Sequence, residues 1–350
     1  MDRPPRRPWA VLVALAILSC GSPVITGPSP AASPSTSSRP VASESSDPGP
    51  SIQPSLPVLG GTWTKGPPLP QPLGEVAGAV LDGKLYVAGG FGLNRQQSAG
   101  FLAFDPKTNT WTQLADLPEP RDHAALTALG GRLFLTGGNG PALAPRANLW
   151  IYSRAANGWS AGPPMPERRS AHAAVEMRGY LFILGGVIAG RPLTDPTWRY
   201  DPVSGVWDTA LAPPPTYREH VAAVVIHDGS ILLIGGRAAR DLGAVERYDP
   251  VTDQWTSLAP LPTARGGLTA ADIENELHVI GGESIESPKV FAEHDVLDLT
   301  AGGKAWALAP PLERGRHGLA SGVIDGRWYL AAGGEHPDLA VSDRLDIFTP

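Results

Sequence analysis

The sequence predicts an all-β fold built from six similar units, each containing four short antiparallel strands. Three observations lead to this prediction. An apolar run that ends in two glycines occurs six times, first at Lys84–Gly90 and last at Arg327–Gly334. Tryptophans recur every 48 residues from Trp63 to Trp255, and Trp306 follows after 51. Helical periodicity is nearly absent, whereas 41 Gly and 38 Pro residues separate the apolar runs.

The first 20 residues have the features of an export signal. Three arginines precede an apolar run of about ten residues, Trp9–Leu18, which is too short to cross a bilayer core of about 30 Å. The following Ile17–Gly21 resembles the lipobox of bacterial lipoproteins, which implies that Cys20 is acylated and becomes the mature N-terminus. We therefore expect an exported lipoprotein anchored to a membrane of a bacterial cell envelope. An ordinary signal peptide with an incidental cysteine is the alternative.

Residues 21–58 differ in composition from the rest of the chain. Pro, Ser, Ala and Thr dominate this segment, and large apolar residues are few. Such a segment cannot bury enough apolar surface to fold, so we predict a disordered tether with a reach of roughly 35 Å. The plan is thus a signal peptide (1–20), a tether (21–58) and a folded body (59–350), which touches the membrane only through the lipid on Cys20.

Charge and cysteine content exclude several functions. The net charge is −6 and no basic stripe is present, so we expect no nucleic-acid partner. Cys20 is the single cysteine, which excludes an intramolecular disulfide and a multi-thiolate metal site.

Each unit is read as four strands in a fixed order. A run of small apolar residues such as Ala77–Leu81 forms the first strand, and the run that ends in Gly-Gly forms the second. Between them stand pairs such as Asp82-Gly83, which suit tight hairpins because glycine accepts positive φ. A third run such as Phe101–Asp105 is followed by an Asp-Pro turn, and the fourth strand contains the tryptophan.

The Gly-Gly runs, the Tyr-Asp or Phe-Asp pairs before the turn and the regular tryptophans together resemble kelch repeats over about residues 60–350. The resemblance implies a six-bladed kelch-type β-propeller. Two copies depart from the pattern, at Ile151–Ser153 and Leu297–Leu299, and the fifth unit has the longest insert, Glu283–Asp295. Because Trp63 precedes the first unit and the last unit lacks a tryptophan, the segment Gly61–Thr64 is predicted to close the last blade as its outer strand.

Candidate ligand-binding residues cluster where the chain approaches each first strand. Alignment on Gly-Gly makes six positions equivalent, namely Leu73, Arg121, Arg169, Arg218, Arg265 and Arg314. A histidine follows closely in four units, at His123, His172, His220 and His317. The arginines could form a cationic funnel for a carboxylate or an acidic sugar. Alternatively, they could bridge adjacent blades and satisfy loop carbonyls, as residues that recur in every unit usually do.

Positions that break the repeat are the better candidates for specificity. Glu219 stands between an arginine and a histidine, and Glu75 replaces a small or histidine-like residue in the first unit. Further polar residues are expected on the second-to-third loops of the same face, namely Arg237, Arg240, Asp241, Glu283, Glu286, Lys289, Glu335 and His336. The predicted binding set is Arg121, Arg169, Arg218, Glu219, His220, Arg265, Arg314, His317, Glu283 and Glu286.

No metal and no cofactor are predicted. The four histidines come from separate blades, and we expect their side chains to lie too far apart to share one ion. The resemblance to the propeller of galactose oxidase does not extend to its copper-radical chemistry, because that chemistry needs a cysteine and the predicted propeller has none.

The leading hypothesis is a monomeric, lipid-anchored, extracytoplasmic protein that binds an envelope protein or glycan through one loop face, without catalysis. The alternative follows from the resemblance to six-bladed sialic acid mutarotases of bacterial envelopes, which are also kelch proteins. It is a mutarotase-like enzyme for a small acidic sugar, with Glu219 and His220 as the acid–base pair.

Overall fold

The computed structural model describes residues 56–188, 191–192, 197–300 and 302–350. The predicted signal peptide, Cys20 and the tether up to residue 55 lie outside the described residues. Among the residues that are described, no helix is long and apolar enough to cross a membrane.

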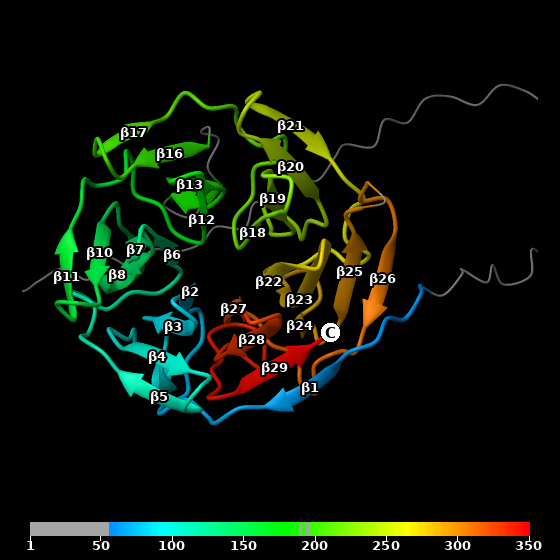
Figure 1. Ribbon diagram of the computed structural model, residues 1–350, viewed down its shortest axis with the longest axis horizontal. Helices are drawn as coiled ribbons and strands as arrows, with labels where there is room; N and C mark the ends of the chain where they lie inside the picture. The colour runs from blue at the N-terminus through cyan, green and yellow to red at the C-terminus, as the bar shows by residue number, and fades with distance from the viewer. Residues whose placement is uncertain (1–55, 189–190, 193–196, 301) are drawn as a thin grey trace, which may run out of the picture. The chain divides into compact units, whose positions relative to one another are not determined.

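Six four-stranded antiparallel sheets form a closed ring around a central axis, which confirms the predicted six-bladed propeller (Figure 1). Blades 1 to 3 are β2 (Ala77–Leu81), β3 (Lys84–Ala88), β4 (Phe101–Asp105), β5 (Thr110–Gln113); β6 (Ala125–Leu129), β7 (Arg132–Thr136), β10 (Leu149–Ser153), β11 (Gly158–Ala161); and β12 (Ala173–Met177), β13 (Tyr180–Leu184), β16 (Trp198–Asp201), β17 (Val206–Asp208). Blades 4 to 6 are β18 (Ala222–Val225), β19 (Ile231–Ile234), β20 (Val245–Asp249), β21 (Gln254–Ser257); β22 (Gly266–Ile273), β23 (Glu276–Ser284), β25 (His294–Asp298), β26 (Trp306–Ala309); and β27 (Ala320–Ile324), β28 (Arg327–Ala331), β29 (Leu345–Thr349), β1 (Thr62–Lys65).

The remaining elements are short and lie in the connections between the second and third strands of four blades. They are η1 (Leu93–Arg95), β8 (Asn139–Gly140), η2 (Pro141–Leu143), β9 (Ala144–Pro145), β14 (Val187–Ile188), β15 (Arg191–Pro192) and β24 (Lys289–Val290). We call the face that carries these connections the loop face.

Hairpin chemistry follows the expectation from the sequence. Asp82 and Gly83 have φ of 49° and 71°, and Asp325 and Gly326 have φ of 49° and 74°. Two successive positive φ values define the tight turn that matches the twist of the flanking strands. These turns join the first strand of a blade to the second on the face opposite the loop face.

The last blade is closed by strand β1, as predicted. Trp63 pairs with Phe348 of β29, so the N-terminal strand becomes the outer strand of blade 6. The Trp63 indole also donates a hydrogen bond of 2.7 Å to the carbonyl of Pro310 in the preceding unit. Contacts begin slightly before the predicted boundary at residue 59, because Leu308 donates its N–H to Pro57 and pairs with Val58.

The apolar core lies between neighbouring blades, where the faces of adjacent sheets pack against each other. The inner strands β2, β6, β12, β18, β22 and β27 surround the axis (Figure 1). Their small side chains leave a channel cavity of about 210 Å³. The polar residues considered next close this channel at the loop face.

Candidate functional site

Six residues, one just before or at the start of each inner strand, form a ring around the axis. All six have positive φ, between 49° and 66°, and they are Glu75, His123, Ala171, His220, Gly267 and Gly318. From the second to the sixth, each donates its backbone N–H to the carbonyl of the preceding member, and Val76 closes the circle by donating to Gly318. We call this set the axial ring; it draws all six blades together at the loop-face end of the channel.

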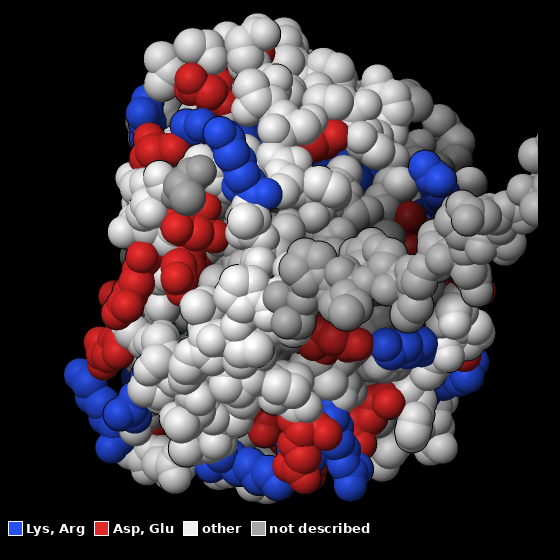
Figure 2. All heavy atoms as spheres, turned by 90° about the vertical axis from the view of Figure 1, so that its right-hand side faces the viewer, with Lys and Arg blue, Asp and Glu red and all other residues white. Residues whose placement is uncertain are grey.

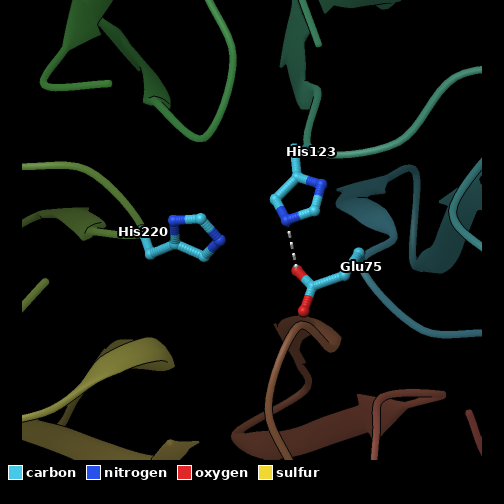
Figure 3. Close-up of side chains that lie close together, drawn as sticks. All are labelled: Glu75, His123 and His220. Carbon is cyan, nitrogen blue, oxygen red and sulfur yellow. Dashed lines mark ion pairs between the residues drawn. The ribbon is translucent and has the colours of Figure 1, made fainter. Parts of the chain in front are cut away.

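Three members of the axial ring carry ionisable side chains that converge (Figure 3). The Nε2 atom of His123 lies 3.3 Å from Oε2 of Glu75. The imidazoles of His123 and His220 meet edge to face, with ring centroids 4.8 Å apart. A small cavity of about 120 Å³ adjoins these side chains. The expectation that ligand-type side chains of separate blades lie too far apart is therefore wrong for these three residues.

Each of the three side chains is held by a further charged partner. Nδ1 of His123 lies 2.5 Å from the Asp122 carboxylate, and Nδ1 of His220 contacts the Glu219 carboxylate. On its other side, Glu75 lies 2.9 Å from Nδ1 of His317. The positions of both histidine rings are thus fixed by a carboxylate from the preceding residue.

Arg237 completes the cluster from the connection between β19 and β20. Its guanidinium donates to Glu219 at 3.0 Å, to Glu283 at 2.8 Å and to Nε2 of His220 at 2.9 Å. We call the whole cluster the axial charge network, and its members are Glu75, Asp122, His123, Glu219, His220, Arg237, Glu283 and His317. Residues of blades 1, 2, 4, 5 and 6 are thereby linked across the axis.

The network shifts the pKa values of its members in opposite directions. Burial alone would raise the pKa of Glu75, but the charges of His123 and His317 hold it well below the usual range. Burial lowers the pKa of His123, yet the Glu75 charge and the hydrogen bond to the adjacent aspartate outweigh it and raise the pKa to about 9. For His220, burial outweighs the contact with Glu219 and lowers the pKa. At neutral pH, His123 is therefore a cation and His220 is neutral.

The repeated arginines do not form a cationic funnel. The side chains of Arg121, Arg169, Arg218 and Arg265 are buried inside the blades, which contradicts their predicted exposure to a ligand. Arg218 and Arg265 pair with carboxylates of their own third strands, at 2.6 Å from Glu246 and from Asp295. In blades 2 and 3 the arginine instead lies over a tryptophan ring, Arg121 on Trp150 and Arg169 on Trp198.

Their backbone carbonyls bridge adjacent blades, as the structural alternative expected. The carbonyl of Arg121 accepts the N–H of Gly90 from the preceding blade at 2.7 Å, and Arg169 accepts that of Gly138 at 2.9 Å. At Gly89 a Cβ atom would collide with this same Arg121 carbonyl. The Gly-Gly pair therefore permits a close approach between blades at each joint.

In the sixth unit, the position expected at Arg314 is occupied by Arg316. The Arg316 side chain is fully buried and lies 2.6 Å from Asp346, whereas the Arg314 side chain is 62% exposed and pairs with Glu335. The reason is a shift in the last Gly-Gly phrase. Ala332, with φ of 62°, occupies the place of the first glycine. Aligning on Gly333-Gly334 therefore displaced the whole unit.

The predicted loop residues of the fifth unit separate into two groups. Glu283 ends strand β23, is buried and belongs to the axial charge network, so the expected loop begins after it. Glu286 lies beyond the strand end, where its carboxylate accepts the N–H of Asp241 at 3.1 Å. The Asp241 carboxylate accepts in return from the Ser284 hydroxyl at 2.5 Å. These contacts join the loops of blades 4 and 5.

A second cavity, of about 420 Å³, opens on the loop face beside blade 1. We call it the blade-1 hollow; its lining residues are Gln71, Pro72, Leu73, Gly92, Leu93, Asn94, Gln96, Gln97 and Ser98. Asn94 and Arg95 in its wall have positive φ of 63° and 59°. Two successive non-glycine residues in this region are strained, and such strain is often found at binding sites. The amide of Gln97 reaches Asp122, which connects this cavity to the axial charge network.

Sequence reasoning missed two features of the site. It did not select Asp122, although the pairs Asp122-His123 and Glu219-His220 stand at the same place in their units. An acid directly before a histidine at a repeated position was the available signal. It also missed the blade-1 hollow, because glutamine and asparagine in a loop have no distinctive spacing.

Comparison with known families identifies the repeats. Residues 61–210 match the KLHDC2/KLHL20/DRC7 Kelch-repeats domain, and residues 222–262 match the Kelch motif. The two stretches include the closing strand β1 and the strands of blades 1 to 4. The prediction of kelch repeats is thereby confirmed.

Individual relatives match only in part. An F-box/kelch-repeat protein of Arabidopsis thaliana is 24% identical over 145 residues, 40% of this chain and 38% of that protein. Beta-scruin of Limulus polyphemus is 30% identical over 154 residues, 40% of this chain and 16% of that protein. The chain thus spans well under half the length of these curated relatives. The solved structure of YjhT matches with a TM-score of 0.67 and 21% identity, over 80% of this chain and 96% of that chain, which shows the shared fold alone.

Proposed function

We propose that this kelch-repeat propeller is a binding protein that recognises a glycan of the cell envelope through its loop face, without catalysis. The observation that carries the proposal is the blade-1 hollow of about 420 Å³. Its volume lies within the range of small-molecule sites, and its loops stand on a rigid ring of sheets. Side-chain amides of Gln71, Asn94 and Gln96 line it. Amides both donate and accept hydrogen bonds, which suits the hydroxyl groups of a sugar.

The distribution of charge also favours an uncharged polar ligand over a nucleic acid. On the side of the molecule seen in Figure 2, the described Lys and Arg side chains are interspersed with Asp and Glu and form no continuous basic stripe. The guanidinium groups that recur in the repeat are buried and paired within the blades. Few cations therefore remain to recognise a phosphate backbone.

The acid–base alternative on Glu219 and His220 is the weaker proposal. Nδ1 of His220 contacts Glu219, and Nε2 accepts a hydrogen bond from Arg237. A general acid or base must reach the proton that it transfers. With Arg237 in place, His220 has no ring nitrogen directed toward a sugar.

Cellular location forms the second part of the proposal. The lipobox-like Ile17–Gly21 and the Pro/Ser-rich tether support a lipid-anchored protein whose binding domain works outside the cytoplasm. A tether with a reach of roughly 35 Å would let the propeller meet glycans near the membrane while remaining attached to it.

The test is a thermal-shift screen of the purified protein against envelope oligosaccharides, followed by calorimetric titration of any that bind. A ligand that binds only the folded state raises the melting temperature. The double variant Gln71→Ala/Gln96→Ala should weaken binding about 10- to 30-fold, since each lost hydrogen bond costs about 1 kcal/mol. Gln113→Ala and Gln254→Ala, on the outer strands β5 and β21, are matched controls that should bind normally.

Two results would overturn the proposal. One is a screen in which no oligosaccharide raises the melting temperature. The other is binding that the double variant leaves unchanged. If, instead, an envelope protein is retained by the wild type and lost by the double variant, the ligand is a protein segment and the glycan proposal fails.

A further inference from the structure

We propose that Glu75, His123 and His220 form a binding site for one divalent transition-metal ion of the zinc class, at the loop-face end of the channel. This inference goes beyond the proposed function, because it concerns the axial ring and not the blade-1 hollow. Two imidazole nitrogens and one carboxylate are a donor set that zinc accepts in proteins.

The geometry brings the three donor atoms close enough to share an ion. One ligand atom from each residue lies within 4.8 Å of the other two. In a tetrahedral zinc site with bonds of about 2.0–2.1 Å, donor atoms lie about 3.4 Å apart. The site therefore needs a contraction of roughly 1 Å, which small rotations of three side chains provide. Figure 3 shows the imidazoles of His123 and His220 and the Glu75 carboxylate directed into one common space.

The surroundings of the donors are those of a metal site. Histidines that bind metal usually donate their other ring N–H to a carboxylate, which orients the ring and raises its basicity. Here Asp122 holds Nδ1 of His123 at 2.5 Å, and Glu219 holds Nδ1 of His220. In both rings Nε2 is consequently the nitrogen left for an ion. The carboxylate donor is supported in turn by His317, 2.9 Å away.

The backbone provides an independent argument. Glu75, His123 and His220 have φ of 52°, 49° and 52°, a region that costs a residue with a side chain about 1–2 kcal/mol. Two other members of the axial ring, Gly267 and Gly318, use the residue that avoids this cost. A Cβ atom at Gly318 would collide with the Glu75 carboxylate. The ring thus keeps three costly ionisable side chains and clears space for one of them.

Arg237 acts as the cation of the site when no metal is bound. Its guanidinium lies 2.9 Å from Nε2 of His220, the nitrogen that the ion would need. Glu219 and Glu283 also hold this guanidinium, at 3.0 and 2.8 Å. A metal ion must therefore displace Arg237 from His220, so the two cations compete. Removal of the Arg237 charge should strengthen metal binding.

Three protein donors leave one position of a tetrahedral ion open. The cavity of about 120 Å³ that adjoins Glu75, His123 and His220 has room for a water molecule or a ligand oxygen at that position. An open position is typical of zinc sites that bind a further ligand, whereas purely structural sites have four protein donors.

The experiment titrates the full chain, freed of metal with a chelator and dialysed, with ZnCl₂ by calorimetry and with CoCl₂ by visible absorption. We expect one ion per chain and the intense absorption of tetrahedral cobalt. His123→Gln and His220→Gln should weaken affinity at least about 100-fold, and Asp122→Asn by about 10- to 100-fold. Arg237→Gln should bind at least about tenfold more tightly, while Arg240→Gln, at an exposed position of the same loop, should match the wild type.

The proposal is overturned if neither the wild type nor Arg237→Gln takes up one ion per chain. It is equally overturned if His123→Gln and Asp122→Asn bind as the wild type does. Circular dichroism melts identify variants that fail to fold, and Arg237→Gln keeps the test decisive, because its predicted effect is a gain. No glycan is present in this titration, so its failure leaves the proposed binding function untouched, and the glycan screen can fail without affecting this result.

Discussion

The buried arginines show how a residue that recurs in every unit serves the fold. In blades 4 to 6, each guanidinium meets a carboxylate at the second position of the third strand, namely Glu246, Asp295 or Asp346. Blades 2 and 3 place Trp150 and Trp198 at that position, and the arginine lies over the indole. Either partner compensates the cation for its loss of water. The repeat thus accepts two chemical solutions for one buried charge.

Arg316 and Arg314 offer a matched pair for testing this role. Arg316→Met should lower the free energy of unfolding by about 3–5 kcal/mol, because it leaves the buried Asp346 carboxylate without its partner. Arg314→Met should change it by at most about 0.5 kcal/mol, since its pair with Glu335 is largely exposed. Urea denaturation measures both variants. Equal losses would show that the buried position is misassigned.

A pair of buried histidines between blades 5 and 6 should make stability depend on pH. Nδ1 of His278 lies 2.9 Å from Nε2 of His294. Burial lowers the pKa of His278 to about 4 and that of His294 to about 3. In the unfolded chain both have a pKa of about 6.5, so below pH 6.5 the unfolded state binds more protons and is favoured.

We therefore expect the free energy of unfolding to fall as the pH is lowered from 6.5 toward 4, by about 2 kcal/mol per histidine at pH 5. Urea denaturation between pH 7 and pH 5 measures the slope. His294→Gln should make it shallower, whereas His336→Gln, at an exposed site, should not. A slope that is the same in wild type and His294→Gln would refute the assignment.

At the scale of the element, the fourth strand of each blade attaches it to its neighbour through a tryptophan. The indole N–H of Trp111 donates to the carbonyl of Pro67, and that of Trp159 donates to Ala115, both in the preceding unit. The same bond recurs at Trp207, Trp255 and Trp306. The bond from Trp63 to Pro310 closes the circle, because β1 belongs to the last blade.

Deletion of Gly61–Pro67 removes this outer strand and exposes the edge of β29. The propeller should then unfold, because the joint between blades 5 and 6 loses its strand pairing and its indole contact. Thermal melting followed by circular dichroism measures the effect. Deletion of the seven residues 40–46 from the tether is the control and should leave the melting temperature unchanged. A propeller that keeps its melting temperature without β1 would contradict closure by the N-terminal strand.

At the scale of the whole molecule, the proposed division of labour separates attachment from recognition. Attachment is proposed to depend on Cys20, and recognition on the loop face. Because a lipid chain contributes about 0.8 kcal/mol for each buried CH₂ group, a diacylated cysteine would hold the protein firmly at a membrane. The propeller would need no membrane-contacting surface of its own.

Cys20→Ser should transfer the protein from the membrane fraction to the soluble or secreted fraction, with no change in the melting temperature of the propeller. Fractionation with immunoblotting measures the distribution, and mass spectrometry of the N-terminal peptide detects the lipid. If the wild type is already soluble, or its cleaved N-terminus lies elsewhere than Cys20, the lipobox interpretation is wrong.

The sequence by itself determined the number of blades, the strands within each blade and the closure by Trp63. These features are local: an apolar run, a turn pair and a tryptophan specify a blade from within its own residues. A repeat also makes its own alignment, and the one misplaced arginine, Arg314, arose where Ala332 replaces a glycine. The local signal failed only where the unit itself departed from the pattern.

Only the tertiary structure decided which polar side chains meet. Glu75, His123 and His220 lie far apart in the sequence, yet the left-handed backbone of the axial ring turns them toward one axis. The arginines next to them share their spacing but are buried within the blades. Spacing in a repeat defines the position along a blade, whereas the backbone conformation at that position decides whether the side chain faces the core or the channel.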